Sequence, residues 1–262
     1  MTTIAHTLIT QKVEDFVAIL TINHPPANAL TPDLLRELES TMDDLAENER
    51  VKALVLTGAG RFFIAGADIR VLAGIASSQE GQKMALDGQA IFNKIERSTK
   101  PVIAAINGAC FGGGLELAMC CHIRLAANEA RLGQPEINLG IIPGFGGTQR
   151  LPRLIGSSKA TELVLTGESI SAEEARTLGL VSQVMPSGDL MRQAIGLARR
   201  IASKGQLAVQ AALQAIRQGT EIGLREGLTL EANLFGALCE SADKTEGLAA
   251  FLEKRQPHFQ DL

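Results

Sequence analysis

Residues 101–121 read PVIAAINGACFGGGLELAMCC, and this stretch decides the expected fold. The apolar run at 101–106 is typical of a strand that is buried on both faces of a sheet. Three consecutive glycines, 112–114, follow it, and a short helix is expected at about 115–121. Glycines between a strand and a helix suit a tight structural turn. They equally suit a nest of backbone N–H groups at a helix N-terminus, which attracts anions and developing oxyanions.

Strands and helices alternate on both sides of this stretch. Thr31 and Pro32 are typical of a helix start, with the threonine as N-cap. Further strands are expected at 13–23, 51–57, 123–126 and 180–185, and closing helices at 187–203, 207–218, 221–240 and 244–255. The pattern predicts an α/β fold with a core over 1–200 and a helical region over 201–262.

Composition excludes several classes of protein. The chain has 262 residues, is 45% hydrophobic and carries a net charge of −4, which argues against disorder and against a globally basic nucleic-acid-binding surface. Without Trp or Tyr, a base-stacking platform is not expected. No apolar run approaches the roughly 18 residues of a membrane span, and residues 1–10 show no secretory signal.

Cysteine and histidine usage gives no metal site. The four cysteines are Cys110, Cys120, Cys121 and Cys239, and their spacing fits neither a zinc pair nor a disulfide framework. Buried, reduced thiols are expected instead, and these indicate a reducing compartment, so we expect a cytoplasmic protein. The four histidines are scattered along the chain.

Two glutamates lie in unusual settings. Glu116 is expected in the first turn of a helix within an otherwise apolar run, and Glu136 follows Pro135 in a glycine-rich irregular segment. Either could be an ordinary solvated side chain. A buried carboxylate costs free energy unless it has a partner or a function, so both are candidates for acid–base chemistry. The small residues at 65–68 would let a ligand approach the backbone closely, or would simply form a turn.

Several motifs together resemble the crotonase superfamily, and most of all its enoyl-CoA hydratase/isomerase family. The matching segments are FIAGADI at 63–69, GGGLELA at 112–118, GQPE at 133–136, GGTQRL at 146–151, TGE at 166–168, residues 172–181 and FLEKR at 251–255. They cover essentially the whole chain in the family's order. The resemblance implies a spiral of ββα units with a C-terminal helical trimerisation region, assembled as a homotrimer or homohexamer.

The resemblance also implies a chemistry. The expected substrate is an acyl-CoA thioester, and the expected reaction is the hydration of a 2-enoyl-CoA in fatty acid metabolism. Coenzyme A is then part of the substrate, and no metal or further cofactor is expected. An enoyl-CoA isomerase or another crotonase-type acyl-CoA lyase is the alternative within the family. A noncatalytic binding module, including an RNA-binding one, is the alternative outside enzymes.

By motif position, the resemblance assigns residues to roles. Glu116 and Glu136 are the expected catalytic pair, and the N–H groups of Ala67 and Gly113 are the expected oxyanion hole. The expected CoA-binding residues are Ala65, Asp68, Ile69, Arg70, Gly144, Phe251 and Lys254, with Arg61 as a further candidate for the phosphates. Phe251 and Lys254 are expected to come from a neighbouring subunit. For the cations, ordinary surface charge is the alternative. Phe145 departs from the family, since a small residue is common there.

Overall fold

The computed structural model describes residues 8–262, and most of the N-terminal stretch inspected for a secretory signal lies outside them. Two sheets form the body of the molecule. The larger has the order β1-β2-β3-β5-β7-β10 and the smaller β4-β6-β8-β9. The strands of the larger sheet are β1 Ile9–Glu14, β2 Val17–Ile22, β3 Ala53–Gly58, β5 Val102–Ile106, β7 Ile123–Ala127 and β10 Gln183–Met185. Those of the smaller are β4 Phe62–Ile64, β6 Ala109–Phe111, β8 Arg131–Gly133 and β9 Ser169–Ser171.

The chain winds as a spiral of ββα units, which confirms the expected fold class. A strand of the large sheet is followed by a strand of the small sheet and then by helices: β3 and β4 precede α2 and α3, β5 and β6 precede α4, and β7 and β8 precede the 3-10 helix η1 and α5. The helices are α1 Pro32–Glu47, α2 Ile69–Ala73, α3 Ser78–Glu96, α4 Gly113–Cys120, η1 Pro135–Leu139, α5 Gly147–Ile155, α6 Ser157–Thr166, α7 Ala172–Thr177, α8 Ser187–Ala202, α9 Gln206–Gly219, α10 Leu224–Leu238 and α11 Ala242–Glu253.

Both faces of the large sheet are covered, which explains its continuously apolar strands. In β3, Leu54 and Leu56 belong to the core beneath α1, whereas Val55 belongs to a second core beneath α8. Successive side chains of a strand point to opposite faces, so a strand covered on both sides needs apolar residues throughout. Thr31 caps α1 by accepting a hydrogen bond from the Leu34 N–H, as expected.

Several local expectations were wrong. The expected strand 13–23 is a hairpin, because Asp15 and Phe16 turn the chain at positive φ between β1 and β2. A phenylalanine at positive φ is rare, so the sequence pattern hides this turn. The strand β4 and the long helix α3 were not expected. Cys239 is exposed, although the other three thiols are buried.

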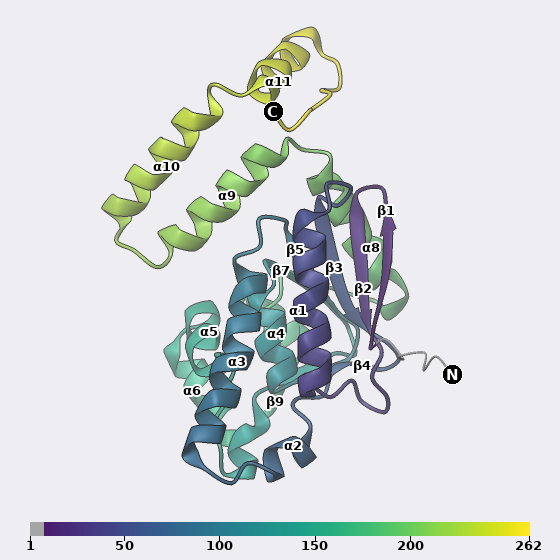
Figure 1. Cartoon of the computed structure of the whole chain (residues 1–262), viewed down its shortest axis with the longest axis vertical. Helices are drawn as coiled ribbons and strands as arrows, with labels where there is room; N and C mark the ends of the chain where they lie inside the picture. Colours follow the sequence, from purple (N-terminus) through teal and green to yellow (C-terminus); the bar gives the residue numbers. More distant parts are fainter. Residues whose placement is uncertain (1–7) are drawn as a thin grey trace.

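The helices α9, α10 and α11 extend away from the sheets (Figure 1). α8 packs on β2, β3, β5 and β7, whereas α9 and α10 pack on each other. The α10 helix has no buried residue, and large apolar side chains project from it and from α11. Within residues 8–262, no helix has the length and apolar character that a membrane crossing requires.

Candidate active site

The turn between β6 and α4 brings a bare backbone close to a carboxylate. Gly112 adopts φ 51°, a conformation that favours glycine, and a Cβ there would lie 2.7 Å from the Glu136 Oε1 atom. A Cβ on Gly114 would lie 2.4 Å from the Ile64 carbonyl oxygen. Larger residues would therefore displace either Glu136 or the strand β4. The three-glycine run is explained by these close approaches and by the start of α4 at Gly113.

Glu116 is held by two backbone N–H groups of one loop. Its side chain projects from α4 into the protein interior, and the residue is only 1% exposed. Its Oε1 atom accepts hydrogen bonds from the backbone N–H groups of Phe145, at 2.8 Å, and Gly147, at 2.7 Å. Burial raises the pKa of Glu116 to about 7, and the two N–H donors oppose part of that rise. The carboxylate thus has a fixed position and a pKa suited to proton transfer near neutrality.

Glu136 is held more loosely, at the start of η1. It is half-buried, and burial raises its pKa to about 7 as well. The neighbouring Gln134 side chain is completely buried, and its terminal amide group lies 3.1 Å from both Glu136 oxygens. The sequence did not assign a role to Gln134. Its polar side chain, buried beside a candidate carboxylate, is the signal that identifies it as a positioning residue.

One cavity of about 810 Å³ joins the predicted reactive groups. Ala67, Gly113, Glu116, Glu136 and Gly144 all line it. Among the hydrogen bonds of residues 8–262, no acceptor takes the N–H of Ala67 or that of Gly113. The cavity therefore combines two free backbone donors with two carboxylates, which is the arrangement that a developing oxyanion and a proton transfer need.

The loop that donates the two hydrogen bonds to Glu116 is anchored by an arginine. Arg150 donates from Nη1 to the Phe145 carbonyl at 3.0 Å and from Nη2 to Glu96 at 2.7 Å. Phe145 is buried, and its ring meets Phe92 edge-on with 5.4 Å between centroids. Arg150 and Phe145 thereby fix the two N–H groups that bind Glu116. The sequence pattern did not reveal this role of Arg150, because the contact joins α5 to α3.

The predicted CoA-binding residues separate into two groups. Ala65, Asp68, Ile69 and Arg70 lie in the segment that contains Ala67. Asp68 has a structural role, since it caps α2 and forms an ion pair with Arg70 at 2.8 Å, and the hydrogen bond from Arg70 lowers the pKa of Asp68. Ile69 and Arg70 are exposed.

The other predicted contacts lie elsewhere in the chain. Arg61 is exposed and lies over the Phe62 ring, 5.4 Å from its centroid. Phe251 is exposed on α11, and Lys254 is the C-cap of that helix. Figure 1 places α11 at the opposite end of the molecule from α2. Within one chain, Phe251 and Lys254 are therefore not brought to the cavity. Across the described residues, no cluster of metal-ligating side chains is present.

Comparisons with known proteins identify the family. A family model described as enoyl-CoA hydratase/isomerase matches residues 12–262. The chain belongs to the enoyl-CoA hydratase/isomerase family. It is 47% identical to a probable enoyl-CoA hydratase of Bacillus subtilis over 96% of this chain and 98% of the relative. It is 44% identical to a crotonyl-CoA hydratase of Syntrophomonas wolfei over 94% of this chain and 95% of the relative.

A solved structure extends the agreement to three dimensions. The chain matches an enoyl-CoA hydratase from Bacillus anthracis with a TM-score of 0.94 and 40% identity, over 98% of this chain and all of the other. The family match includes the cavity and the C-terminal helices alike. The expected family and fold are both confirmed.

Proposed function

We propose that this protein is an enoyl-CoA hydratase, which adds water across the double bond of a 2-enoyl-CoA thioester and gives a 3-hydroxyacyl-CoA. The observation that carries the proposal is one cavity with two free backbone N–H groups and two carboxylates whose pKa values are raised to about 7. The family relatives support the same reaction. Coenzyme A is part of the substrate, and the reaction needs no separate cofactor.

The N–H groups of Ala67 and Gly113 form the oxyanion hole of the proposed mechanism. They bind the thioester oxygen, which gains negative charge when water attacks the β-carbon. Gly113 is the first residue of α4, so the positive end of the helix dipole lies behind its N–H. Preorganised donors of this kind stabilise the enolate without reorganisation during the reaction.

The two carboxylates divide the proton transfers. Glu116 accepts two backbone hydrogen bonds, which favour its ionised form, so it is the group that takes a proton from water. The hydroxide oxygen bonds to the β-carbon, the electron pair of the Cα=Cβ double bond forms a double bond between the α-carbon and the carbonyl carbon, and the carbonyl π pair moves to the thioester oxygen. Glu136, protonated, then delivers a proton to the α-carbon as the enolate collapses. The proton on Glu116 is then transferred to Glu136 within the cavity, which restores the starting protonation of both groups.

The CoA moiety is proposed to lie along the segment that contains Ala67. The backbone at Ala65, Asp68 and Ile69 and that at Gly144 then contacts the pantetheine and the adenine, and Arg70 and Arg61 are available for the phosphates. Phe251 and Lys254 would complete this site from a neighbouring subunit, because they lie far from the cavity of their own chain.

We also propose a homotrimer or homohexamer assembled through the helical region 201–262, with the core over 1–200 carrying the site. The support is the apolar surface of α10 and α11, where the exposed fraction reaches 79% for Leu224, 68% for Phe235 and 80% for Leu252. Such a surface costs free energy in water unless another chain covers it. Light scattering should find an oligomer, and a fully active monomer would contradict the assembly.

The buried thiols suit a reducing compartment such as the cytoplasm.

A direct assay tests the function. The absorbance of the conjugated thioester in crotonyl-CoA should fall when the protein is added, because hydration removes the double bond. A parallel assay with a 3-enoyl-CoA measures isomerisation. No fall with crotonyl-CoA, together with turnover of the 3-enoyl-CoA, would favour the isomerase instead. No reaction with either substrate would leave another crotonase-type acyl-CoA lyase or a noncatalytic binding module.

A further inference from the structure

A polar stripe on α3 faces the loop that binds Glu116. The stripe consists of Gln89, Asn93 and Glu96, which recur at the spacing of one helix face. Gln89 donates from Nε2 to the Gly144 carbonyl at 2.8 Å, which is a direct contact with the loop. The other two stripe residues contact the loop through an arginine.

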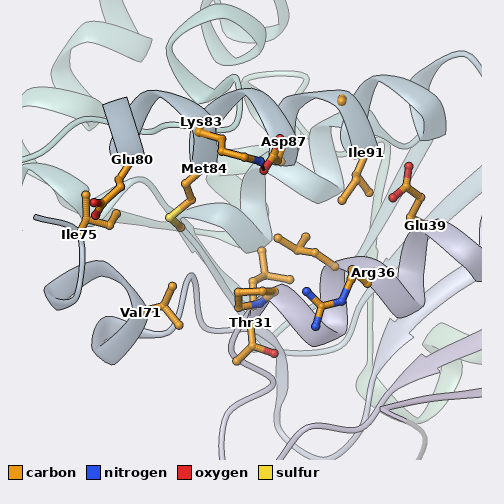
Figure 2. A pocket seen from close by; sticks show the side chains of 15 residues that line it. Thr31, Arg36, Glu39, Val71, Ile75, Glu80, Lys83, Met84, Asp87 and Ile91 are labelled. Atoms are coloured by element: carbon orange, nitrogen blue, oxygen red, sulfur yellow. Dashed lines mark hydrogen bonds and ion pairs between the residues drawn. The ribbon is translucent and has the colours of Figure 1, made fainter. Parts of the chain in front are cut away.

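The opposite side of α3 has different neighbours. It lines a separate cavity of about 540 Å³, which lies beside α1 and α2 (Figure 2). Lys83, Asp87 and Ile91 belong to that side, and Lys83 pairs with Asp87 at 2.6 Å. The stripe residues do not line this cavity, so the two sides of the helix are distinct.

Arg150 connects the stripe to the loop. Its Nη2 atom donates to Asn93 Oδ1 at 2.6 Å and to Glu96 Oε2 at 2.7 Å, and its Nε atom donates to Glu96 Oε1 at 3.1 Å. Its Nη1 atom donates to the Phe145 carbonyl at 3.0 Å. The guanidinium is a rigid planar fork, so the acceptors on α3 and the acceptor in the loop fix its orientation together.

Gly146 shows how closely the loop fits the guanidinium. It adopts φ 112°, and a Cβ there would collide with the Nη1 atom of Arg150. Gly146 stands between Phe145 and Gly147, whose N–H groups donate to Glu116 Oε1. A displacement of the guanidinium would therefore move both donors.

We propose that Asn93 and Glu96 are positioning residues for the hydration reaction and act on Glu116 through Arg150. They hold the guanidinium, the guanidinium holds the Phe145 carbonyl, and the loop keeps its two N–H donors on the carboxylate. The inference rests on the proposed function, in which Glu116 accepts a proton from water. Without the acceptors on α3, the loop relaxes and the ionised form of Glu116 loses its hydrogen bonds.

The charged groups near Glu116 make this role measurable. Burial is the main cause of its raised pKa, Glu136 on η1 adds to the rise, and Arg150 on α5 opposes it. Removing only the charge of Glu96 would leave Arg150 less neutralised and lower the pKa of Glu116, whereas losing the N–H donors would raise it. Burial lowers the pKa of His122, which faces Glu96, to about 4, so its ring stays neutral near pH 7.

The test compares Glu96→Ala with Glu96→Gln in the hydration of crotonyl-CoA. Both variants remove the charge, but glutamine keeps an oxygen that Arg150 can bind. Glu96→Ala should lower kcat about tenfold or more with little change in KM, because a misplacement of about 1 Å can cost about 10²-fold. It should also move the acid limb of kcat/KM to higher pH. Glu96→Gln should retain most of the wild-type kcat without raising that limb.

Glu39→Ala is the matched control for the loss of a carboxylate beside α3. Glu39 pairs at 3.0 Å with Lys94, which lies outside the stripe and keeps Asp43 as a second partner at 2.9 Å. This variant should leave kcat and the acid limb unchanged. If Glu96→Ala does not fold, Asn93→Ala should lose kcat in its place, whereas Asn93→Asp, which keeps an acceptor for Arg150, should retain it.

The outcomes separate the inference from the proposed function. Equal kcat values in the alanine and glutamine variants, or an acid limb that moves to lower pH in Glu96→Ala, would overturn the positioning role and leave the hydratase intact. The proposed function fails separately, if the wild type does not hydrate crotonyl-CoA.

Discussion

The two walls of the catalytic cavity are built differently. On the α4 wall, Glu116 is buried and receives two backbone hydrogen bonds from the loop that Arg150 anchors. On the η1 wall, Glu136 is half-buried, and the exposed apolar residues Leu139, Ile141 and Ile142 follow it. One wall is complete within a single chain, whereas the other leaves apolar surface uncovered. In the proposed mechanism we therefore expect the α4 wall to fix the position of the proton-accepting carboxylate, and the η1 wall to offer apolar surface that the substrate or another chain could cover.

The largest expected effect comes from removing a donor of the α4 wall. Gly113→Pro deletes the N–H group, and hydration of crotonyl-CoA should fall by about 10³-fold, the scale of losing one oxyanion-hole donor. Proline is tolerated at the first position of a helix, which is where Gly113 lies. Steady-state kinetics measures the loss, and circular dichroism verifies the fold.

Gly113→Ala is the matched control for this variant. It keeps the N–H group but adds a Cβ that would lie 2.8 Å from the flexible end of the Leu30 side chain. Alanine should therefore retain most of the activity that proline loses. Equal losses in the two folded variants would point to the added bulk and not to the missing donor.

The carboxylate substitutions compare the walls directly. Glu116→Gln and Glu136→Gln should each lower kcat for hydration at least about 10²-fold, the usual scale for a positioned acid or base. The double variant should be little worse than the poorer single one, because groups that act as a unit are not additive. Hydration that survives either substitution within a few-fold would exclude the pair as the catalytic machinery.

A side reaction separates the two roles. Isomerisation of a 3-enoyl-CoA needs proton transfer at the α-carbon but no attacking water. Glu136→Gln should therefore suppress any isomerase activity, whereas Glu116→Gln should retain more of it. Both reactions are to be measured in both variants. The opposite ranking would exchange the roles of the two walls.

The α4 wall was the easier one to predict from sequence. Gly112–Gly114 and Glu116 are close in the chain, and glycines before a helix indicate a tight turn from the local sequence alone. The partners of Glu116 are the N–H groups of Phe145 and Gly147, which belong to another segment and carry no side-chain signature. Such contacts depend on tertiary packing, so no local pattern predicts them.

The remaining differences have equally physical causes. Helix α3 was missed although it has 19 residues, because it buries only Gly88, Ile91, Phe92 and Ile95, all in its C-terminal half. Its N-terminal half lines the catalytic cavity and carries no continuous apolar stripe. Phe251 and Lys254 were assigned by resemblance alone, and one chain does not bring them to the cavity.

The pH dependence of hydration should reflect the pKa values of both carboxylates. Burial raises the pKa values of Glu116 and Glu136 to about 7, and the reaction needs one of them ionised and the other protonated. The kcat/KM for hydration should therefore be bell-shaped with a maximum near neutrality, and fall on both sides. In Glu136→Gln the alkaline limb of the residual activity should disappear, since no proton on residue 136 remains to be lost. An alkaline limb that persists would assign it to another group.

The smallest expected effect is on the free energy of unfolding, and it also distinguishes the two walls. The pKa of Glu116 is about 7 in the folded protein, against an ordinary value of 4.5. The protonated carboxyl group therefore contributes stability that is fully present below pH 4.5 and is lost as the pH rises through 7. Glu116→Gln removes this cost of burying a charge and keeps an oxygen for the two N–H donors. Its free energy of unfolding should exceed that of the wild type at pH 8, by up to about 3 kcal/mol, and match it near pH 4.5. Glu136→Gln should gain less, because water reaches that half-buried side chain. Urea unfolding at the two pH values measures both differences, and an equal gain in the two variants would show that the walls bury their carboxylates alike.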